Sequence, residues 1–91
     1  MDFKVNSTDN GLKIELDGDL TFENHRDFKE IIGLIKEAQD DVEISLKGLS
    51  NMDSAGAGML KLAQDRAKQG GGSFDITDVP EELEVFVSLL K

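Results

Sequence analysis

The feature of this sequence that most constrains its fold is an alternation of strand-like and helix-like segments. Residues 12–16 and 42–46 place apolar side chains at every second position, as in strands with one buried face. Between them, from about residue 24 to 38, apolar residues recur at intervals of three and four, which is typical of an amphipathic helix with Thr21 or Asn24 as its N-cap. A strand, a helix and a second strand in this order indicate two parallel strands joined by a right-handed crossover.

The segments before the first helix predict a β-hairpin. Residues 3–6 also alternate, and an Asp-Asn-Gly turn at positions 9–11 joins them to residues 12–16. Residues 17–19 are expected to break the strand, and residues 47–52 to form a loop after the third strand.

The second half of the chain predicts a helix, a short strand and a last helix. The first of these helices is expected from Ser54 to about Gln69, and the three glycines at positions 70–72 end it because glycine tolerates the left-handed conformation. Residues 74–77 predict a fourth strand. Asp78 and Glu81 then have the spacing of a capping box for the last helix.

Polar residues at every second position of these strands indicate that one face of the sheet is polar. Parallel strands covered on both faces would instead be almost continuously apolar. We therefore predict an α/β fold with a four-stranded mixed sheet in the order 1-2-3-4, in which an initial hairpin is followed by parallel strands and the helices lie mainly on one face. With 91 residues, the chain has the size of one small domain spanning residues 1–91.

The charge balance and the absence of cysteine exclude several classes of protein. Nineteen acidic against ten scattered basic residues give a formal net charge of −9, which disfavours nucleic-acid binding. Without cysteine there is no disulfide, thiolate nucleophile or cysteine-based zinc site. The first residues lack the features of a signal peptide, and the longest apolar cluster, at residues 85–90, is too short to span a bilayer. We expect a cytoplasmic protein without membrane insertion.

The most informative segment for function is Asp-Ser-Ala-Gly-Ala-Gly at positions 53–58, which follows the third strand and opens the second helix. Sites in sheets with parallel strands gather at the carboxyl ends of the strands. A serine there meets free backbone N–H groups and the positive end of the helix dipole, which can hold an attached phosphate. The small side chains that follow would let another protein approach closely. The alternative is an ordinary N-cap at Asp53 or Ser54, with small residues that pack on the sheet. Met59, Leu62 and Ala63 are expected to face the core, whereas Met52 and Leu60 could border the exposed motif.

Other kinds of site have less support. Residues 56–58 lack the third glycine of a dinucleotide fingerprint and the ending of a P-loop. His25, the only histidine, would have to lie beside Ser54 with an oxyanion hole and a pocket to form a hydrolase triad, and we expect it to be a surface residue instead. The acidic pairs at 40–41 and 81–82 are too local to form a metal site. We therefore predict no catalytic residue, no metal and no cofactor.

In this order of elements, Asp-Ser-Ala-Gly at positions 53–56 resembles the STAS domain of bacterial anti-sigma factor antagonists. The resemblance covers nearly the whole chain: the hairpin, the turn at residues 18–20, the first helix, the late glycines and the last helix. It implies a non-enzymatic signalling module, a phosphoprotein that regulates transcription by partner switching. The serine phosphorylated in this family maps onto Ser54. The implied partners are a GHKL-type serine kinase that doubles as the anti-sigma factor and a PP2C-type phosphatase.

Phosphorylation would switch off partner binding by adding about −1.5 to −2 charges to a tight interface. The chain departs from the family at Ala55, where many relatives carry Ser or Thr, and at Ala57, where leucine is usual. The resemblance leaves a second function open, a non-phosphorylated STAS accessory subunit of a lipid-transport type transporter. The residues predicted on the partner-binding surface are Asp53, Ser54, Ala55, Gly56, Ala57, Gly58, Asp19, Leu20 and Thr21.

Overall fold

The computed structural model describes residues 1–9, 11–38 and 40–90. Its four strands, joined into one sheet in sequence order, are β1 (Asp2–Ser7), β2 (Gly11–Leu20), β3 (Asp41–Met52) and β4 (Phe74–Thr77). β1 and β2 are antiparallel, whereas β3 is parallel to both β2 and β4. The predicted mixed sheet, its strand order and the opening hairpin are confirmed, while Asn10 of the expected turn lies outside the described residues.

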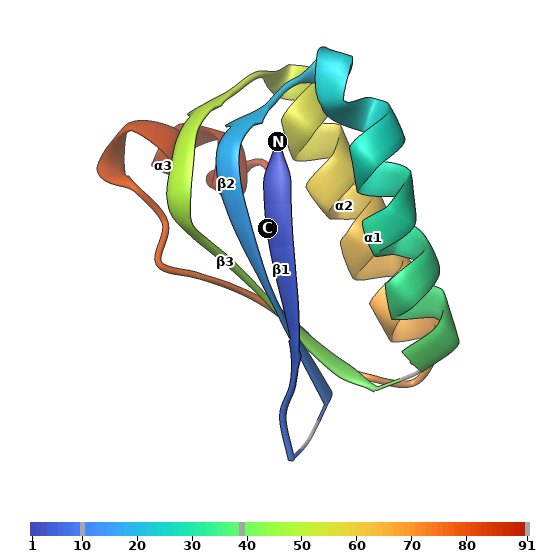
Figure 1. Cartoon of the computed structure of the whole chain (residues 1–91). Helices are drawn as coiled ribbons and strands as arrows, with labels where there is room; N and C mark the ends of the chain where they lie inside the picture. Colours follow the sequence, from blue (N-terminus) through green and yellow to red (C-terminus); the bar gives the residue numbers. More distant parts are fainter. Residues whose placement is uncertain (10, 39, 91) are drawn as a thin grey trace.

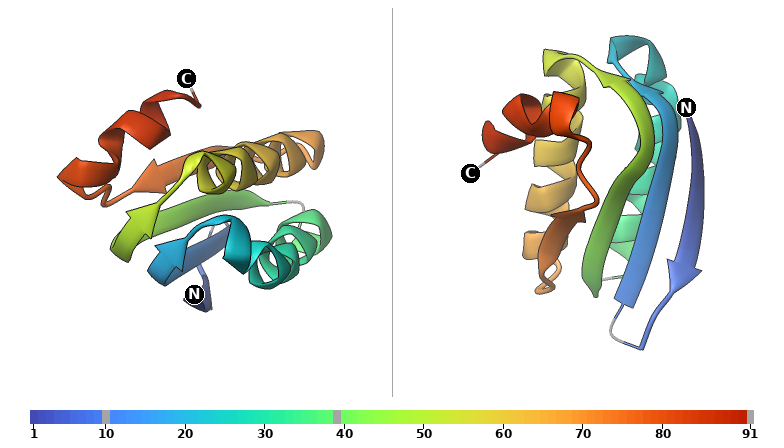
Figure 2. Two further views of the ribbon diagram at one scale, coloured as in Figure 1. Left: turned by 90° about the horizontal axis from the view of Figure 1, so that it is seen from above. Right: turned by 90° about the vertical axis from the view of Figure 1, so that its left-hand side faces the viewer.

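Two long helices, α1 (His25–Ala38) and α2 (Ser54–Gln69), lie side by side on one face of the sheet (Figure 1). The 3₁₀ turn η1 (Phe22–Asn24) leads into α1. The short α3 (Glu84–Ser88), preceded by η2 (Glu81–Leu83), lies beyond β4 at the edge of the sheet (Figure 2). None of the helices formed by the described residues is long and apolar enough to cross a membrane.

The main core lies between the sheet and these two helices. Its strand side chains are Ile14, Leu16, Leu20, Val42, Ile44, Leu46, Leu49 and Met52. The side chains that pack on them from α1 are Phe28, Ile31 and Ile35, and those from α2 are Ala57, Leu60, Ala63 and Ala67. Because α2 presents mainly small side chains to the sheet, it packs close to the strands. This close packing determines which side of α2 faces the sheet and which side faces outward.

β2 and β3 are both longer than the sequence pattern predicted. Residues 17–19 continue β2 instead of breaking it, and residues 47–52 continue β3 instead of forming a loop. The β2–β3 register shifts twice between residues 15 and 19, and Gly18 adopts a positive φ of 91° there. Such irregularities interrupt the two-residue period of a strand, which is why alternation alone did not identify these extensions.

The predicted capping box at the start of the last helix is wrong. Asp78 has a positive φ of 53°, and its carboxylate accepts a hydrogen bond from the Ser45 hydroxyl at 2.8 Å. Pro80 occupies the N-cap position of η2, without a side-chain cap. Asp78 therefore anchors the chain to the sheet rather than starting a helix.

Candidate functional site

Ser54 is the first residue of α2, and its side chain is exposed. A single residue separates the start of α2 from the end of β3, at the end of the molecule where α1 also begins (Figure 1). The N-cap is Asp53, whose Oδ1 accepts a hydrogen bond from the Gly56 N–H at 2.8 Å. Across the described residues no hydrogen bond involves the Ser54 hydroxyl. Asp53 thus caps one N–H group of the first turn of α2 and leaves Ser54 open to another molecule.

The Asp53 carboxylate also holds the turn that leads into α1. Its Oδ2 accepts a hydrogen bond from the Phe22 N–H at 3.2 Å, and the Asp53 N–H lies 3.4 Å from the Leu20 carbonyl oxygen. One residue therefore joins the β2–α1 turn to the start of α2. The two segments form one preorganised surface around Ser54, although they are far apart in the sequence.

The turn at the end of β2 is closed by hydrogen bonds between Thr21 and Asn24. The Thr21 N–H donates to Asn24 Oδ1 at 3.2 Å, and the Asn24 N–H donates to the Thr21 carbonyl oxygen at 2.9 Å. Thr21 is the N-cap of η1, one of the two caps expected from the sequence. Thr21 is half-buried and Asp19 is exposed, so both side chains are at least partly accessible, and their part in partner binding stays a prediction.

Three of the predicted contact residues lie beneath this surface. Leu20 is completely buried, and Gly56 and Ala57 are buried as well. A Cβ at Gly56 would lie 2.1 Å from the Leu20 carbonyl oxygen and 2.9 Å from Met52 Cγ. The missing side chain at Gly56 therefore lets α2 pack against the end of β2. These residues support the surface from below and offer no side chain to a partner.

The exposed part of the motif continues along the outer side of α2. Ser54, Gly58 and Leu62 lie four residues apart, with Ala55 half-buried beside them. A Cβ at Gly58 would meet nothing within 4 Å, and Leu62 is 41% exposed. The prediction that Leu62 faces the core is wrong, and so is the prediction that Met52 and Leu60 border the exposed motif, because both of these side chains are buried in the core. We refer to Ser54, Ala55, Gly58 and Leu62 as the Ser54 surface.

Phe22 is a residue of this region that the sequence reasoning missed. It is 66% exposed, and its ring stacks on His25 with the ring centroids 5.1 Å apart. His25 Nδ1 lies 2.9 Å from the Phe22 carbonyl oxygen, and His25 is on the surface as expected. Its position in the sequence could have indicated that Phe22 is exposed. Phe22 precedes the helical spacing of apolar residues that begins at Phe28, so it is not needed for the buried face of α1.

Three carboxylates, those of Asp19, Glu23 and Asp53, lie within three residues of Phe22 or Ser54 in the sequence. Asp19 and Glu23 are exposed and Asp53 is half-buried. None of these three carboxylates takes part in an ion pair within the described part of the chain. Over the same residues, no group of three or more His, Asp or Glu is arranged to hold a metal ion. The site is suited to a partner with basic side chains at its rim.

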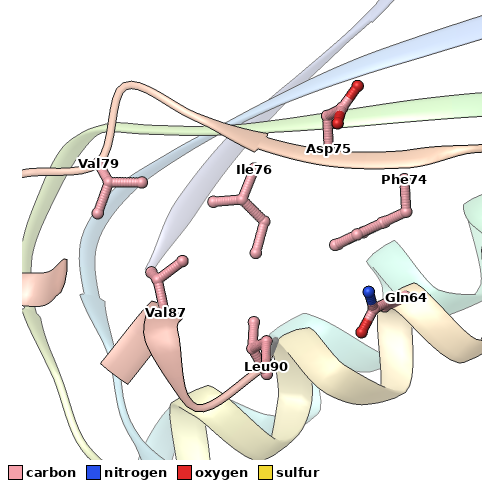
Figure 3. A pocket seen from close by; sticks show the side chains of 7 residues that line it. All are labelled: Gln64, Phe74, Asp75, Ile76, Val79, Val87 and Leu90. Atoms are coloured by element: carbon pink, nitrogen blue, oxygen red, sulfur yellow. The ribbon is translucent and has the colours of Figure 1, made fainter. Parts of the chain in front are cut away.

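A separate cavity lies between α2, β4 and the C-terminal segment (Figure 3). It has a volume of about 300 Å³, at the lower limit for small-molecule sites. Its lining residues are Gln64, Phe74, Asp75, Ile76, Val79, Val87 and Leu90. No predicted site residue lines it, so this cavity and the Ser54 surface are distinct.

Comparisons with known proteins agree with this arrangement. A family model described as "Mlab, STAS domain" matches residues 3–91. The chain belongs to the STAS domain family. This match confirms the resemblance to STAS domains found in the sequence, and a STAS domain is a regulatory domain rather than an enzyme.

The fold of this STAS domain is also found among solved structures. The chain is similar to one described as "Structure of the Anti-Sigma Factor Antagonist SpoIIAA in its Unphosphorylated Form", with 22% sequence identity and a TM-score of 0.70. The match covers 94% of this chain and 82% of that one. No curated protein matches the chain. The structural match confirms the predicted fold.

Proposed function

We propose that this STAS domain is a signalling module of the anti-sigma factor antagonist type. It binds a GHKL-type serine kinase that also acts as an anti-sigma factor, and phosphorylation of Ser54 releases it. The observation that carries this proposal is the exposed hydroxyl of Ser54 at the start of the 16-residue helix α2. The similar solved structure, described as an anti-sigma factor antagonist in its unphosphorylated form, supports the same class of function.

The start of α2 can carry a phosphate without a change of fold. Phosphorylation adds about −1.5 to −2 charges, which the helix dipole and the free N–H groups of the first turn stabilise. Asp53 already accepts hydrogen bonds from the N–H groups of Gly56 and Phe22, so its charge is partly compensated. The modified chain therefore keeps its structure while its surface changes.

A partner, in contrast, would be displaced by this phosphate. Gly58 has open space above its backbone and Ala55 has a small side chain, so a partner can approach Ser54 closely. A phosphate at such a contact adds both bulk and charge, and burying an unpaired charge costs several kcal/mol. Because each 1.4 kcal/mol is about tenfold in affinity, the switch needs no refolding. A PP2C-type phosphatase would restore binding, and bound kinase would release its sigma factor.

The proposal can be tested with purified proteins. The chain is incubated with Mg-ATP and each GHKL-type serine kinase encoded in the same genome, and the phosphate is located by mass spectrometry. We expect one phosphate, on Ser54, and Ser54→Ala is expected to abolish labelling while retaining kinase binding. Ser54→Asp is expected to weaken binding at least about 100-fold, or about 3 kcal/mol.

The matched control is Ser73→Asp, which adds the same charge at an exposed position just before β4, at the opposite end of the strands. This variant should bind like the unchanged chain. A phosphate located outside Ser54, or unchanged binding by Ser54→Asp, would contradict the proposal.

A second candidate is the accessory subunit of a transporter, which holds an ATPase subunit without phosphorylation. The observation that favours it is the exposed Leu62, two helical turns from Ser54 on the same side of α2. The strength of an apolar contact between Leu62 and an ATPase subunit does not depend on the charge at Ser54. This function predicts a complex with a transport ATPase that survives Ser54→Asp and is lost in Leu62→Asp.

A further inference from the structure

We propose that Phe22 is the apolar anchor of the Ser54 surface, and that the partner receives it in an apolar pocket with a basic rim. This inference rests on the proposed function, because it assigns an anchoring residue and a partner chemistry to the same surface. It adds a residue from the β2–α1 turn, outside the Asp-Ser-Ala-Gly segment.

The first argument is the exposure of an aromatic ring on a residue that is hydrogen-bonded to Asp53, the residue before Ser54. The large apolar residues with more than a third of their surface exposed in the described chain are Val5, Phe22, Leu62, Val85 and Leu89. Phe22 is the aromatic residue of this group, and it lies next to Asp53, the residue before Ser54. Large aromatic side chains provide much of the apolar contact area that drives association. Single exposed apolar residues are common, so exposure alone does not identify an anchor.

The second argument is that the position of Phe22 is fixed before a partner arrives. Its backbone N–H is held by Asp53 Oδ2 at 3.2 Å. On the other side, its ring stacks on the His25 ring at 5.1 Å with an interplanar angle of 24°. A side chain that is already ordered loses less conformational entropy on binding, which favours affinity. The hydrogen bond to Asp53 also keeps the Phe22 backbone next to the residue that precedes Ser54.

The third argument is charge complementarity. Asp19 and Glu23, on either side of Phe22 in the sequence, are exposed, and Asp53 is half-buried. These carboxylates form no ion pair with other described residues, and the chain has a formal net charge of −9. A partner that encloses Phe22 therefore gains from basic side chains at the rim of its pocket. The residues that follow Ser54 on the exposed side of α2, Ala55 and Gly58, are small and uncharged, so an added phosphate still obstructs contact there.

The test measures affinity for the GHKL-type kinase that labels Ser54, in the presence of ADP. Phe22→Ala is expected to weaken binding about 30-fold or more, as for the loss of an interface hot spot. Phe22→Leu should retain part of the affinity because it keeps an apolar side chain. The matched control is Leu89→Ala, which removes an apolar side chain that is 67% exposed beyond α3, and it should change binding less than about twofold. Unchanged thermal unfolding of Phe22→Ala excludes a folding defect.

The results separate this inference from the proposed function. If Phe22→Ala binds like Leu89→Ala while Ser54→Asp does not bind, the anchor is rejected and the proposed function stands. If Ser54→Asp binds normally, or no kinase labels the chain, both are rejected. If the pocket has a basic rim, the double variant Asp19→Asn/Glu23→Gln should associate with the kinase more slowly, and so should the unchanged chain at raised salt. An unchanged association rate would overturn the proposed basic rim.

Discussion

Two aspartates that each follow a parallel strand, Asp53 and Asp78, have opposite effects on the chain after them. Asp53 has an extended backbone, with φ −121°, and its carboxylate caps α2 and holds Phe22. Asp78 has φ 53°, and its carboxylate accepts a hydrogen bond from Ser45, leaving η2 without a side-chain cap. The first connection exposes the start of a long helix, and the second ties a short helical segment to the sheet.

The difference arises from where the two strands end. β4 ends with Thr77 level with Ser45 of β3, so Asp78 emerges beside a buried hydroxyl that needs an acceptor. β3 continues to Met52, and Asp53 emerges beyond that point, where the free N–H groups of α2 and the β2–α1 turn are its partners. The available partner, and not the residue type, determines which connection leaves an open surface.

The strongest test of this comparison is Gly56→Ala. The added Cβ would lie 2.1 Å from the Leu20 carbonyl oxygen, so α2 has to move away from the end of β2. We expect the free energy of unfolding to fall by about 3 kcal/mol, at the upper end for an overpacked site. Urea unfolding followed by circular dichroism measures it, and a loss below about 1 kcal/mol would show that the close packing is not required.

The same comparison shows which parts of the fold could be predicted from the sequence. The alternation in residues 12–16 and 42–46 predicted the sheet and its polar face. Successive side chains of a strand point to opposite faces, so apolar residues at every second position define the buried face. Residues 17–19 and 47–52 were not assigned to strands, because register shifts break that period. The position of Asp78 before Pro80 and Glu81 suggested a cap, but its partner Ser45 is 33 residues away in the sequence.

For the candidate site, local sequence predicted the position of Ser54 but not its surroundings. An aspartate and a serine before small residues indicate a helix start, and Asp53 is the cap. The link from Asp53 to Phe22 spans 31 residues, so no short motif contains it. The exposure of Leu62 depends on the rotation of α2, which the contact between Gly56 and the end of β2 fixes.

Asp53→Ala is expected to have the next largest effect. It removes the acceptor for both the Gly56 and the Phe22 N–H groups, and loss of an N-cap alone reduces stability by about 1–2 kcal/mol. Partner binding should fall as well, because the turn that carries Phe22 is released. Asp53→Asn keeps an acceptor for Gly56 and should lose less than half as much stability, and equal losses in both variants would rule out the capping role.

At the other connection, Asp78→Ala is expected to reduce stability by about 1–2 kcal/mol, because it leaves the buried Ser45 hydroxyl without its acceptor. Partner binding should stay unchanged, in contrast to Asp53→Ala. Adding Ser45→Ala to this variant should restore part of the stability, since the unsatisfied hydroxyl is then absent. A double-mutant cycle measures the coupling, and strictly additive losses would show that the hydrogen bond contributes nothing.

The smallest expected effect on stability is that of Gly58→Ala, which is the matched partner of Gly56→Ala on the same helix. Its Cβ would meet nothing within 4 Å, and replacing glycine by alanine inside a helix raises stability by up to about 1 kcal/mol. If the open backbone at Gly58 serves the approach of a partner, kinase binding should nevertheless weaken, although the folded domain is more stable. Calorimetric unfolding and kinase affinity measured on the same protein separate the two effects. A stabilised variant with unchanged affinity would mean that the partner does not contact α2 at this turn, and would confine the interface to Ser54 and Phe22.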